Sequence, residues 1–205
     1  VLDIGCGTGR MAVPLLGYLT RESTYVGFDI SAKAIEWCKS HVSRENSSFK
    51  FFHADIYNKE YNPKGRLSAS EYRFPCEDES VDFIIATSVF THLGPEQVRY
   101  YLSEIFRTLR KGGRCFITYF ILNEESIRLM PDSGFDFNIA LDGCYTIDPK
   151  TPERAIAYTE ASVKRMHERA GLRISEPVRF GSWCGRETSF TGQDIVIANK
   201  ADMAV

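Results

Sequence analysis

The sequence predicts an α/β fold in which a mostly parallel sheet carries helices on both faces. Short β-rich apolar runs alternate with amphipathic helical stretches from the first residue to about residue 120. The opening segment VLDIGCGTGR joins an apolar run to a helical one through a glycine-rich turn. Two β-rich runs close the chain without a helix between them, which favours an antiparallel pair at the sheet edge. With 205 residues, of which 43% are hydrophobic, we expect a single domain over residues 1–205.

The expected elements follow in order along the first half of the chain. Five strands are predicted, at residues 1–4, 24–29, 48–53, 81–87 and 114–120. Three helices are predicted between them, at residues 10–19, 32–43 and 95–109. Pro14 falls in the middle of the first helix and argues against its regularity there. The last helix begins at Pro95 and is closed by Gly112 and Gly113.

The second half of the chain loses this alternation. Residues 123–152 are expected to be irregular, followed by a helix over 159–170 that stops at Gly171. Strands over 172–180 and 194–199 finish the fold. Residues 57–79 are rich in Asn, Pro, Gly and Ser, so we expect an insertion before the fourth strand.

Composition excludes several classes of protein. Lysine and arginine number 25 against 27 acidic residues, and neither sign forms a long block, so we expect no nucleic-acid partner. No apolar run approaches the roughly 20 residues needed to cross a bilayer, so no membrane partner is expected. The six cysteines are scattered without close pairs, which favours free thiols in a reducing, cytoplasmic setting.

The first candidate for ligand binding is the glycine-rich turn that follows the first strand. Gly5, Gly7 and Gly9 let the backbone turn tightly and approach a ligand closely. The unpaired amides at the start of the next helix favour a negatively charged ligand group. A turn of this kind also serves other nucleotides, or closes a strand-to-helix corner without any ligand.

Acidic residues follow the second and third strands. Asp29, in YVGFDIS, is able to accept both hydroxyls of a ribose, although helix capping is the alternative and Ser31 is available for that role. Asp55, in FFHADIY, is able to accept from an adenine amino group while Ile56 packs on the ring. A solvated turn aspartate is the alternative interpretation of Asp55.

Together these segments resemble the class I S-adenosylmethionine-dependent methyltransferases. The resemblance extends over nearly the whole chain and includes FIIATSVFTHL, YLSEIFRTLRKGGRCFIT and GQDIVIANK. It implies a seven-stranded sheet of order 3-2-1-4-5-7-6 with the last strand antiparallel, and S-adenosylmethionine as cofactor with S-adenosylhomocysteine as product. The methionine part would lie on the turn, the ribose on the second strand end and the adenine on the third. The cofactor residues implied by the resemblance are Asp3, Gly5, Cys6, Gly7, Gly9, Asp29, Ile30, Asp55, Ile56 and Ser88.

The sequence departs from the family pattern in two places. The family normally places helices before the first strand, whereas this sequence begins at Val1 inside the expected strand, so we expect that such helices are missing upstream. The insertion over residues 57–79 is not explained by the cofactor.

A nicotinamide-dependent dehydrogenase is the strongest competing enzyme class. Its fingerprint also uses a glycine-rich turn and an acidic residue about 20 positions later. Arg10 stands where the third glycine of that fingerprint falls, and no second mononucleotide-binding half follows. These two differences disfavour the dehydrogenase interpretation.

His92, in SVFTHL, is the best candidate for a general base because it follows the fourth strand, where the ligand crevice is expected. Capping a helix and packing on the cofactor are its alternatives. Four further side chains are candidates for binding the methyl acceptor, with core packing or solvation as alternatives: Phe90, Tyr119, Trp183 and Arg186.

Several acceptors are disfavoured by the motifs that are absent. The residues after the fourth strand are not those of amino-methylating nucleic-acid enzymes, and Pro75 with Cys76 lies on the wrong side for a cytosine carbon methylase. No acidic cluster resembles that of catechol methylases, so no metal is expected. We therefore expect methyl transfer to a small-molecule oxygen, nitrogen or carbon atom, in an oligomeric state that the sequence leaves open. The alternatives are a noncatalytic cofactor-binding module and, less favoured, a protein methyltransferase.

Overall fold

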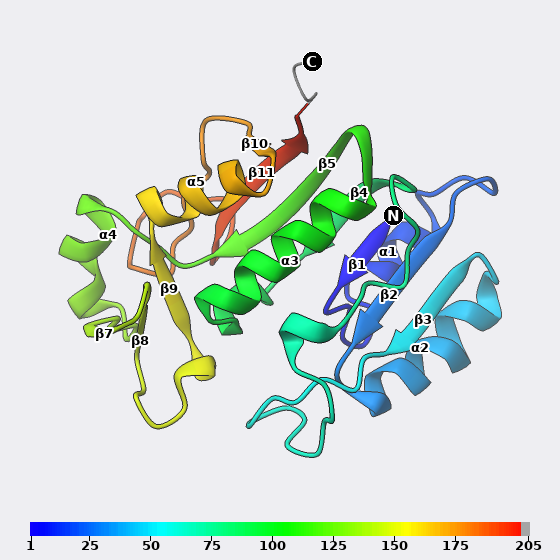
Figure 1. The fold of residues 1–205 in the computed structure, drawn as a ribbon, viewed down its shortest axis with the longest axis horizontal. Helices are drawn as coiled ribbons and strands as arrows, with labels where there is room; N and C mark the ends of the chain where they lie inside the picture. Colours follow the sequence, from blue (N-terminus) through cyan, green and yellow to red (C-terminus); the bar gives the residue numbers. More distant parts are fainter. Residues whose placement is uncertain (202–205) are drawn as a thin grey trace.

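The computed structural model describes residues 1–201 and contains a seven-stranded sheet in the order β10-β11-β5-β4-β1-β2-β3 (Figure 1). Its strands are β1 (Leu2–Ile4), β2 (Tyr25–Asp29), β3 (Phe49–His53), β4 (Val81–Ala86), β5 (Leu109–Tyr119), β10 (Leu172–Ile174) and β11 (Asp194–Lys200). Strands β1 to β5 are paired in parallel, whereas β11 is antiparallel to both β5 and β10. The predicted α/β class and the order 3-2-1-4-5-7-6 are confirmed.

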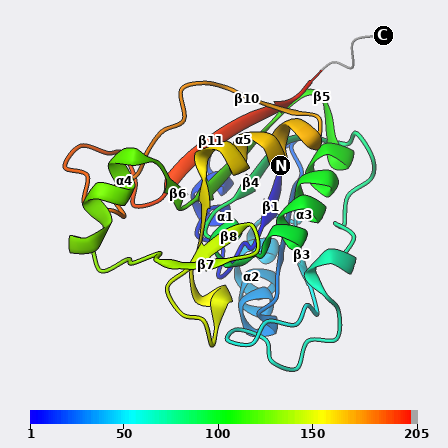
Figure 2. The same cartoon turned by 60° about the vertical axis from the view of Figure 1, so that its left-hand side comes forward.

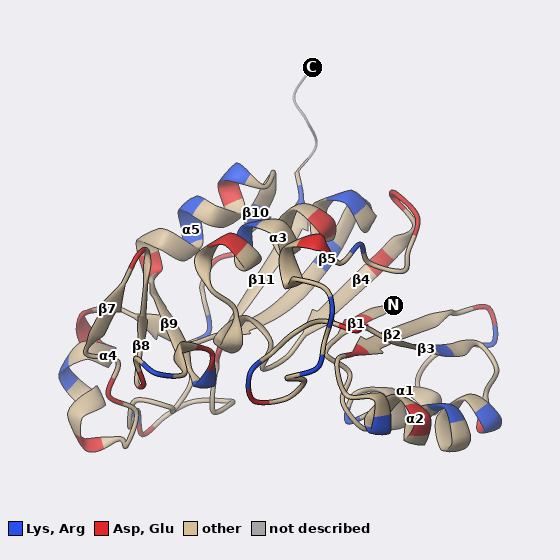
Figure 3. Cartoon of the chain, turned by 60° about the horizontal axis from the view of Figure 1, so that its bottom comes forward, with Lys and Arg blue, Asp and Glu red and all other residues tan. Residues whose placement is uncertain are grey.

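Helices cover both faces of this sheet (Figure 3). Helices α1 (Ala12–Leu16) and α2 (Ala32–Glu45) bury one apolar cluster with the sheet, which includes Tyr25 and Phe51. Helices α3 (Pro95–Thr108) and α5 (Glu160–Arg169) bury a larger cluster on the opposite face. Because side chains alternate along each strand, both faces of the parallel sheet are apolar and both need a helical layer.

Two elements differ in extent from the prediction. Helix α1 covers only Ala12–Leu16, so Pro14 lies in its first turn. A backbone N–H in the first turn has no partner within the helix, so a proline there costs no hydrogen bond. Strand β5 begins at Leu109 instead of Arg114, because Val81 pairs with Leu109 and Phe83 with Arg114 across a bulge. Gly112 supplies the positive φ of 71° that this bulge requires.

The segment over residues 123–152, expected to be irregular, contains a helix and two short strands, and this corrects part of the prediction. Helix α4 (Glu124–Leu129) is capped at Asn123, whose side chain accepts from Ser126 N–H. A second sheet of order β6-β9-β8-β7 follows (Figure 2). Its strands are β6 (Ile121–Leu122), β7 (Ile139–Leu141), β8 (Cys144–Thr146) and β9 (Ile156–Thr159). Strands of two to four residues are too short to produce a visible hydrophobic period.

The predicted insertion before β4 is an ordered loop. The backbone N–H of Tyr57 donates to Leu67 O at 2.8 Å, and Asn58 and Asn62 form a second bridge inside the loop. The edge strand β10 is also shorter than predicted, since it ends at Ile174 and pairing with β11 resumes only at Arg179. No helix within residues 1–201 has both the length and the apolar character needed to span a membrane.

Candidate functional site

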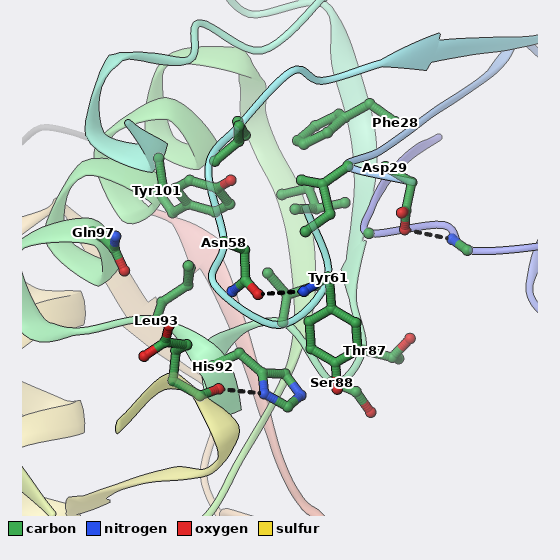
Figure 4. A pocket seen from close by; sticks show the side chains of 18 of the residues that line it. Phe28, Asp29, Asn58, Tyr61, Thr87, Ser88, His92, Leu93, Gln97 and Tyr101 are labelled. Atoms are coloured by element: carbon green, nitrogen blue, oxygen red, sulfur yellow. Dashed lines mark hydrogen bonds between the residues drawn. The ribbon is translucent and has the colours of Figure 1, made fainter. Parts of the chain in front are cut away.

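A large pocket lies at the carboxyl ends of β1, β2 and β4 (Figure 4). Its volume is about 960 Å³, at the upper end of the range of roughly 300 to 1,000 Å³ that is usual for ligand sites. Side chains on the glycine turn, on the insertion loop and on the second sheet line it. The carboxyl ends of parallel strands are where open α/β sheets bind ligands.

The glycine turn forms one wall of this pocket. Gly5 has φ 70°, and a Cβ there would lie 2.4 Å from Cγ2 of Val89. Gly7 has φ 51° with no heavy atom within 4 Å of the position of an added Cβ, so its backbone faces open space. Gly5, Cys6 and Gly7, three of the residues expected to bind the cofactor, line the pocket. Gly9 does not line the pocket, because it faces Cys38 of α2. Without a side chain, Gly9 lets the turn pack closely against that helix.

Asp29 links the glycine turn to the start of α2. Its Oδ2 accepts from Gly7 N–H and its Oδ1 accepts from Ser31 N–H, both at 2.8 Å. Ser31 is the N-cap, because its hydroxyl accepts from Ala34 N–H. Asp29 is therefore free of the capping role, and its carboxylate lies in the pocket wall.

Asp3 is a buried carboxyl at the end of β1 that also lines the pocket. Its Oδ2 accepts from the hydroxyl of Tyr25, whereas its Oδ1 has no partner within the described residues. Burial raises the pKa of Asp3 to about 7, with the nearby charge of Asp29 adding to that rise. A buried carboxyl oxygen without a partner at a pocket wall is suited to receive a donor or cation from a ligand.

Ile30 and Ile56 line the pocket, whereas the carboxylate of Asp55 does not. Asp55 Oδ2 forms an ion pair with Arg66 Nε at 2.5 Å, outside the pocket. That hydrogen bond is the main reason why the pKa of Asp55 is lowered. The structure therefore does not bring the predicted adenine acid together with the other site residues, and this corrects the expectation for its side chain.

Ser88 lines the pocket directly after β4 and adopts a left-handed backbone conformation with φ 58°. Its N–H donates to Thr118 Oγ1 at 2.8 Å, and its hydroxyl lies 3.1 Å from Gln193 Oε1. This strained geometry is rare outside glycine and is usually kept only where the surroundings enforce it. Because the Ser88 N–H is already used, only other Ser88 groups remain for a ligand.

His92 lines the pocket from the short helix η2 (Phe90–His92) that follows β4. Its Nδ1 lies 2.8 Å from the carbonyl oxygen of Glu153, which lies between β8 and β9 of the second sheet. Its ring meets the ring of Tyr61 edge-on, with centroids 5.6 Å apart. The predicted general base is thus half-buried at the pocket wall.

Two of the predicted acceptor residues belong to the core. Phe90 is fully buried and packs edge-on against Tyr101 and Tyr119, so Tyr101 and not Phe90 reaches the pocket. Tyr119 is fully buried among Phe90, Tyr158 and His167. The expectation that both contact the acceptor is corrected, because both rings belong to the apolar cluster that packs against α3.

Trp183 and Arg186 are the other two, and they connect the loop between β10 and β11 to β11 and to α4. Trp183 Nε1–H donates to Oδ2 of the buried Asp194 at 2.7 Å. Arg186 donates to Gly181 O at 2.9 Å and to Glu125 of α4 at 2.6 Å. Both side chains are buried away from the pocket, and the prediction that they bind the acceptor is corrected.

The sequence did not identify three groups of residues that line the pocket. The insertion loop contributes Tyr57, Asn58 and Tyr61, and the second sheet with its preceding turn contributes Pro152, Glu153 and Ile156. Helix α3 and the glycine turn add Glu96, Gln97, Tyr101, Thr8, Arg10 and Met11. The sequence signal for the first group was the pair Tyr57 and Tyr61, which follow the third strand in an otherwise polar loop.

The charge of the lining is unbalanced. Within the described chain, four carboxyl-bearing residues line the pocket, Asp3, Asp29, Glu96 and Glu153, against one guanidinium, that of Arg10. Such a lining favours a ligand with positive charge and disfavours a phosphodiester backbone. Across residues 1–201 no three His, Cys, Asp or Glu side chains gather as a metal site would require.

A protein-family model described as a methyltransferase domain matches residues 1–113. Among curated proteins, a tRNA N(3)-methylcytidine methyltransferase of Drosophila melanogaster is 25% identical over 174 residues, 84% of this chain and 48% of the relative. The chain therefore spans about half the length of that relative.

Solved structures share the fold. An S-adenosylmethionine-dependent methyltransferase from Methanosarcina mazei has a TM-score of 0.60 at 24% identity, covering 97% of this chain and 91% of the other. The 1,6-didemethyltoxoflavin-N1-methyltransferase of Burkholderia thailandensis, solved with 1,6-didemethyltoxoflavin and S-adenosylhomocysteine, has a TM-score of 0.62 at 17% identity. That match covers 98% of this chain and 70% of the other.

Proposed function

The chain belongs to the methyltransferase domain family, among the class I S-adenosylmethionine-dependent enzymes, and we propose that it methylates a small-molecule acceptor. The observation that carries this proposal is the pair of carboxyl groups, Asp3 and Asp29, on either side of the glycine turn in one large pocket. Asp3 and Asp29 lie near the ends of neighbouring strands. Strands β1 and β2 are paired in parallel, and Asp3 lies opposite Gly27.

The residues present fit S-adenosylmethionine. Its amino and sulfonium groups are cationic, which suits a lining with four carboxyl groups and the unpartnered Oδ1 of Asp3. The open backbone of Gly7 leaves room for close approach of the methionine part. Asp29 would accept the ribose hydroxyls, and Ile30 and Ile56 would pack on the adenine.

S-adenosylmethionine, when bound, supplies a methyl group on sulfur that is already an activated leaving group. The chain's own residues then have to orient the acceptor and exclude water. Ser88 and Val89 line the pocket between the glycine turn and His92. The rest of the volume, toward Tyr61, His92 and Ile156, is the proposed acceptor side.

Methylation of a tRNA cytidine is a second candidate. The name of the Drosophila melanogaster relative supports it, and so do the exposed rings of Tyr57 and Tyr61 beside Lys59, which suit base stacking. The acidic lining argues against it, and basic and acidic residues are interspersed along the chain (Figure 3). We therefore favour the small molecule.

Transfer from methyl-labelled S-adenosylmethionine tests the proposal. The purified chain is incubated with a panel of small metabolites and, separately, with total tRNA, and the label is followed into each fraction. Label in a small molecule supports the proposal, whereas label only in tRNA supports the second candidate. Saturable cofactor binding without transfer to any fraction would instead favour a noncatalytic module.

A further inference from the structure

The hydrogen bond between His92 and Glu153 determines which ring nitrogen of His92 carries the proton. Nδ1 lies 2.8 Å from the carbonyl oxygen of Glu153, and a carbonyl oxygen only accepts. Nδ1 must therefore be the donor. In the neutral ring this leaves the lone pair on Nε2, which is the form that accepts a proton.

Aromatic and apolar side chains lie with His92 in the pocket lining. The ring of Tyr61 stands edge-on to His92, and both lie on the same side of the pocket (Figure 4). Leu93, Pro152 and Ile156 add apolar surface to the same lining. An aromatic ring beside apolar side chains favours a flat ring over a strongly hydrated chain.

Resting on the proposed function, we infer that the acceptor is a phenolic compound whose hydroxyl proton is taken by Nε2 of His92. In the step, the phenol O–H bond breaks and its proton moves to Nε2. The phenol oxygen bonds the methyl carbon while the carbon–sulfur bond breaks, its electron pair remaining on sulfur. Glu153 O then holds the imidazolium through the same Nδ1–H bond, until the proton passes to solvent.

Proton affinity favours a phenol over an aliphatic alcohol. Phenols ionise at about pH 10, as tyrosine does. A general base works best when the proton transfer is not strongly uphill. Aliphatic hydroxyls hold their protons far more tightly, so a neutral imidazole would assist them little.

Thr146 is the positioning residue for this hydrogen bond. It is fully buried on β8, and its Oγ1 lies 3.0 Å from both Pro152 O and Ala155 O. These two carbonyl groups belong to residues on either side of Glu153, and Glu153 lies in the short helix η4 (Pro152–Arg154). The second sheet thus sets the place of the carbonyl that orients His92.

The tautomer is tested by long-range proton–nitrogen NMR on ¹⁵N-labelled protein. The sequence has four histidines, and a His92→Gln spectrum identifies the His92 signals. We expect Nδ1 protonated and Nε2 unprotonated. His167 is an internal reference, because its Nδ1 lies 2.9 Å from Val163 O in the buried core. A His92 ring protonated at Nε2 would overturn the inference.

The acceptor class is tested with phenol and anisole as probes on the complex with S-adenosylhomocysteine. Phenol donates a hydrogen bond and anisole does not, so only phenol should shift the Nε2 signal of His92. Equal shifts with both probes, or no shift with either, would overturn the phenolic assignment. Calorimetric titration with S-adenosylhomocysteine, made beforehand, separates this result from failure of the proposed function itself.

The role of Thr146 is tested with Thr146→Val and Thr146→Ser. Valine keeps the shape but removes the hydroxyl, whereas serine keeps it. We expect Thr146→Val to speed solvent exchange of the His92 Nδ1 proton at least tenfold and Thr146→Ser to leave it within about threefold. Equal exchange in both variants would show that Thr146 supports the fold without positioning His92.

Discussion

Asp29 Oδ2 accepts a hydrogen bond from the backbone N–H of Gly7, with the two atoms 2.8 Å apart. This bond ties the end of β2 to the glycine turn after β1. It fixes the carboxylate at the wall of the pocket, and Ser31 N–H holds the other oxygen. Because one carboxylate both shapes the turn and faces the ligand, its charge is expected to matter more than that of any other pocket acid.

Asp29→Asn is expected to weaken binding of S-adenosylmethionine about 10- to 100-fold, since charge-assisted hydrogen bonds to the ribose are worth roughly 1.5 to 3 kcal/mol. Asp55→Asn is the matched control, because that carboxylate pairs with the exposed Arg66 outside the pocket. We expect it to weaken binding by less than about threefold. Isothermal titration calorimetry measures both. A larger loss in Asp55→Asn than in Asp29→Asn would reverse the assignment of the two acids.

Gly7→Ala tests whether the ligand approaches the turn closely. Gly7 has φ 51° and Gly112 has φ 71°, and an added Cβ meets nothing within 4 Å at either position. Both substitutions should therefore cost a similar ~1 to 2 kcal/mol of backbone strain. Only Gly7 lines the pocket, so only Gly7→Ala should weaken cofactor binding by tenfold or more. Equal affinities in the two variants would argue that the ligand stays away from Gly7.

The sequence predicted the parts of the site that lie at strand ends. Asp3 and Asp29 lie near the carboxyl ends of strands that their apolar runs identify, and the parallel register brings the two ends together. His92 was predicted for the same reason, because it lies in the short segment that follows β4. The position of a strand is encoded in the local sequence, and the positions of these site residues follow mainly from the strands.

Side-chain direction in loops could not be predicted in the same way. Asp55 was correctly placed after the third strand, but Arg66 in the insertion loop turns its carboxylate outward. Arg186 was expected at a rim, yet α4 supplies Glu125 and covers it, and α4 lies in a segment that shows no helical period. Partners distant in sequence decide such cases, and a single sequence does not reveal them.

Trp183→Phe distinguishes a structural role from an acceptor role. The substitution keeps a ring but removes the Nε1–H that reaches Asp194 at 2.7 Å. The free energy of unfolding should fall by about 1 to 3 kcal/mol, because the buried Asp194 carboxylate loses one of its donors and keeps Ile121 N–H. Trp37→Phe is the control, since Trp37 is 40% exposed, and should cost less than about 0.5 kcal/mol. Chemical denaturation measures both, and a change in cofactor affinity without a change in stability would contradict the structural role.

Asp3 makes cofactor binding depend on pH. Burial raises the pKa of its carboxyl to about 7 in the free protein, so the group is neutral below that value and ionised above it. In the free fold this raised pKa stabilises the protein at low pH, and that stability is lost as the pH rises toward about 7. A cationic ligand at Oδ1 favours the ionised form, so binding below pH 7 must release a proton.

The affinity for S-adenosylmethionine should therefore rise about tenfold between about pH 6 and about pH 8, and binding near pH 6 should release close to one proton. Titration calorimetry in buffers of different ionisation enthalpy measures the affinity and the proton count together. Asp3→Asn is the control, because it keeps an acceptor for Tyr25 but cannot ionise. Its affinity should be lower at high pH and nearly independent of pH. A slope of equal size in Asp3→Asn would mean that another group titrates, and that Asp3 stays in one protonation state throughout.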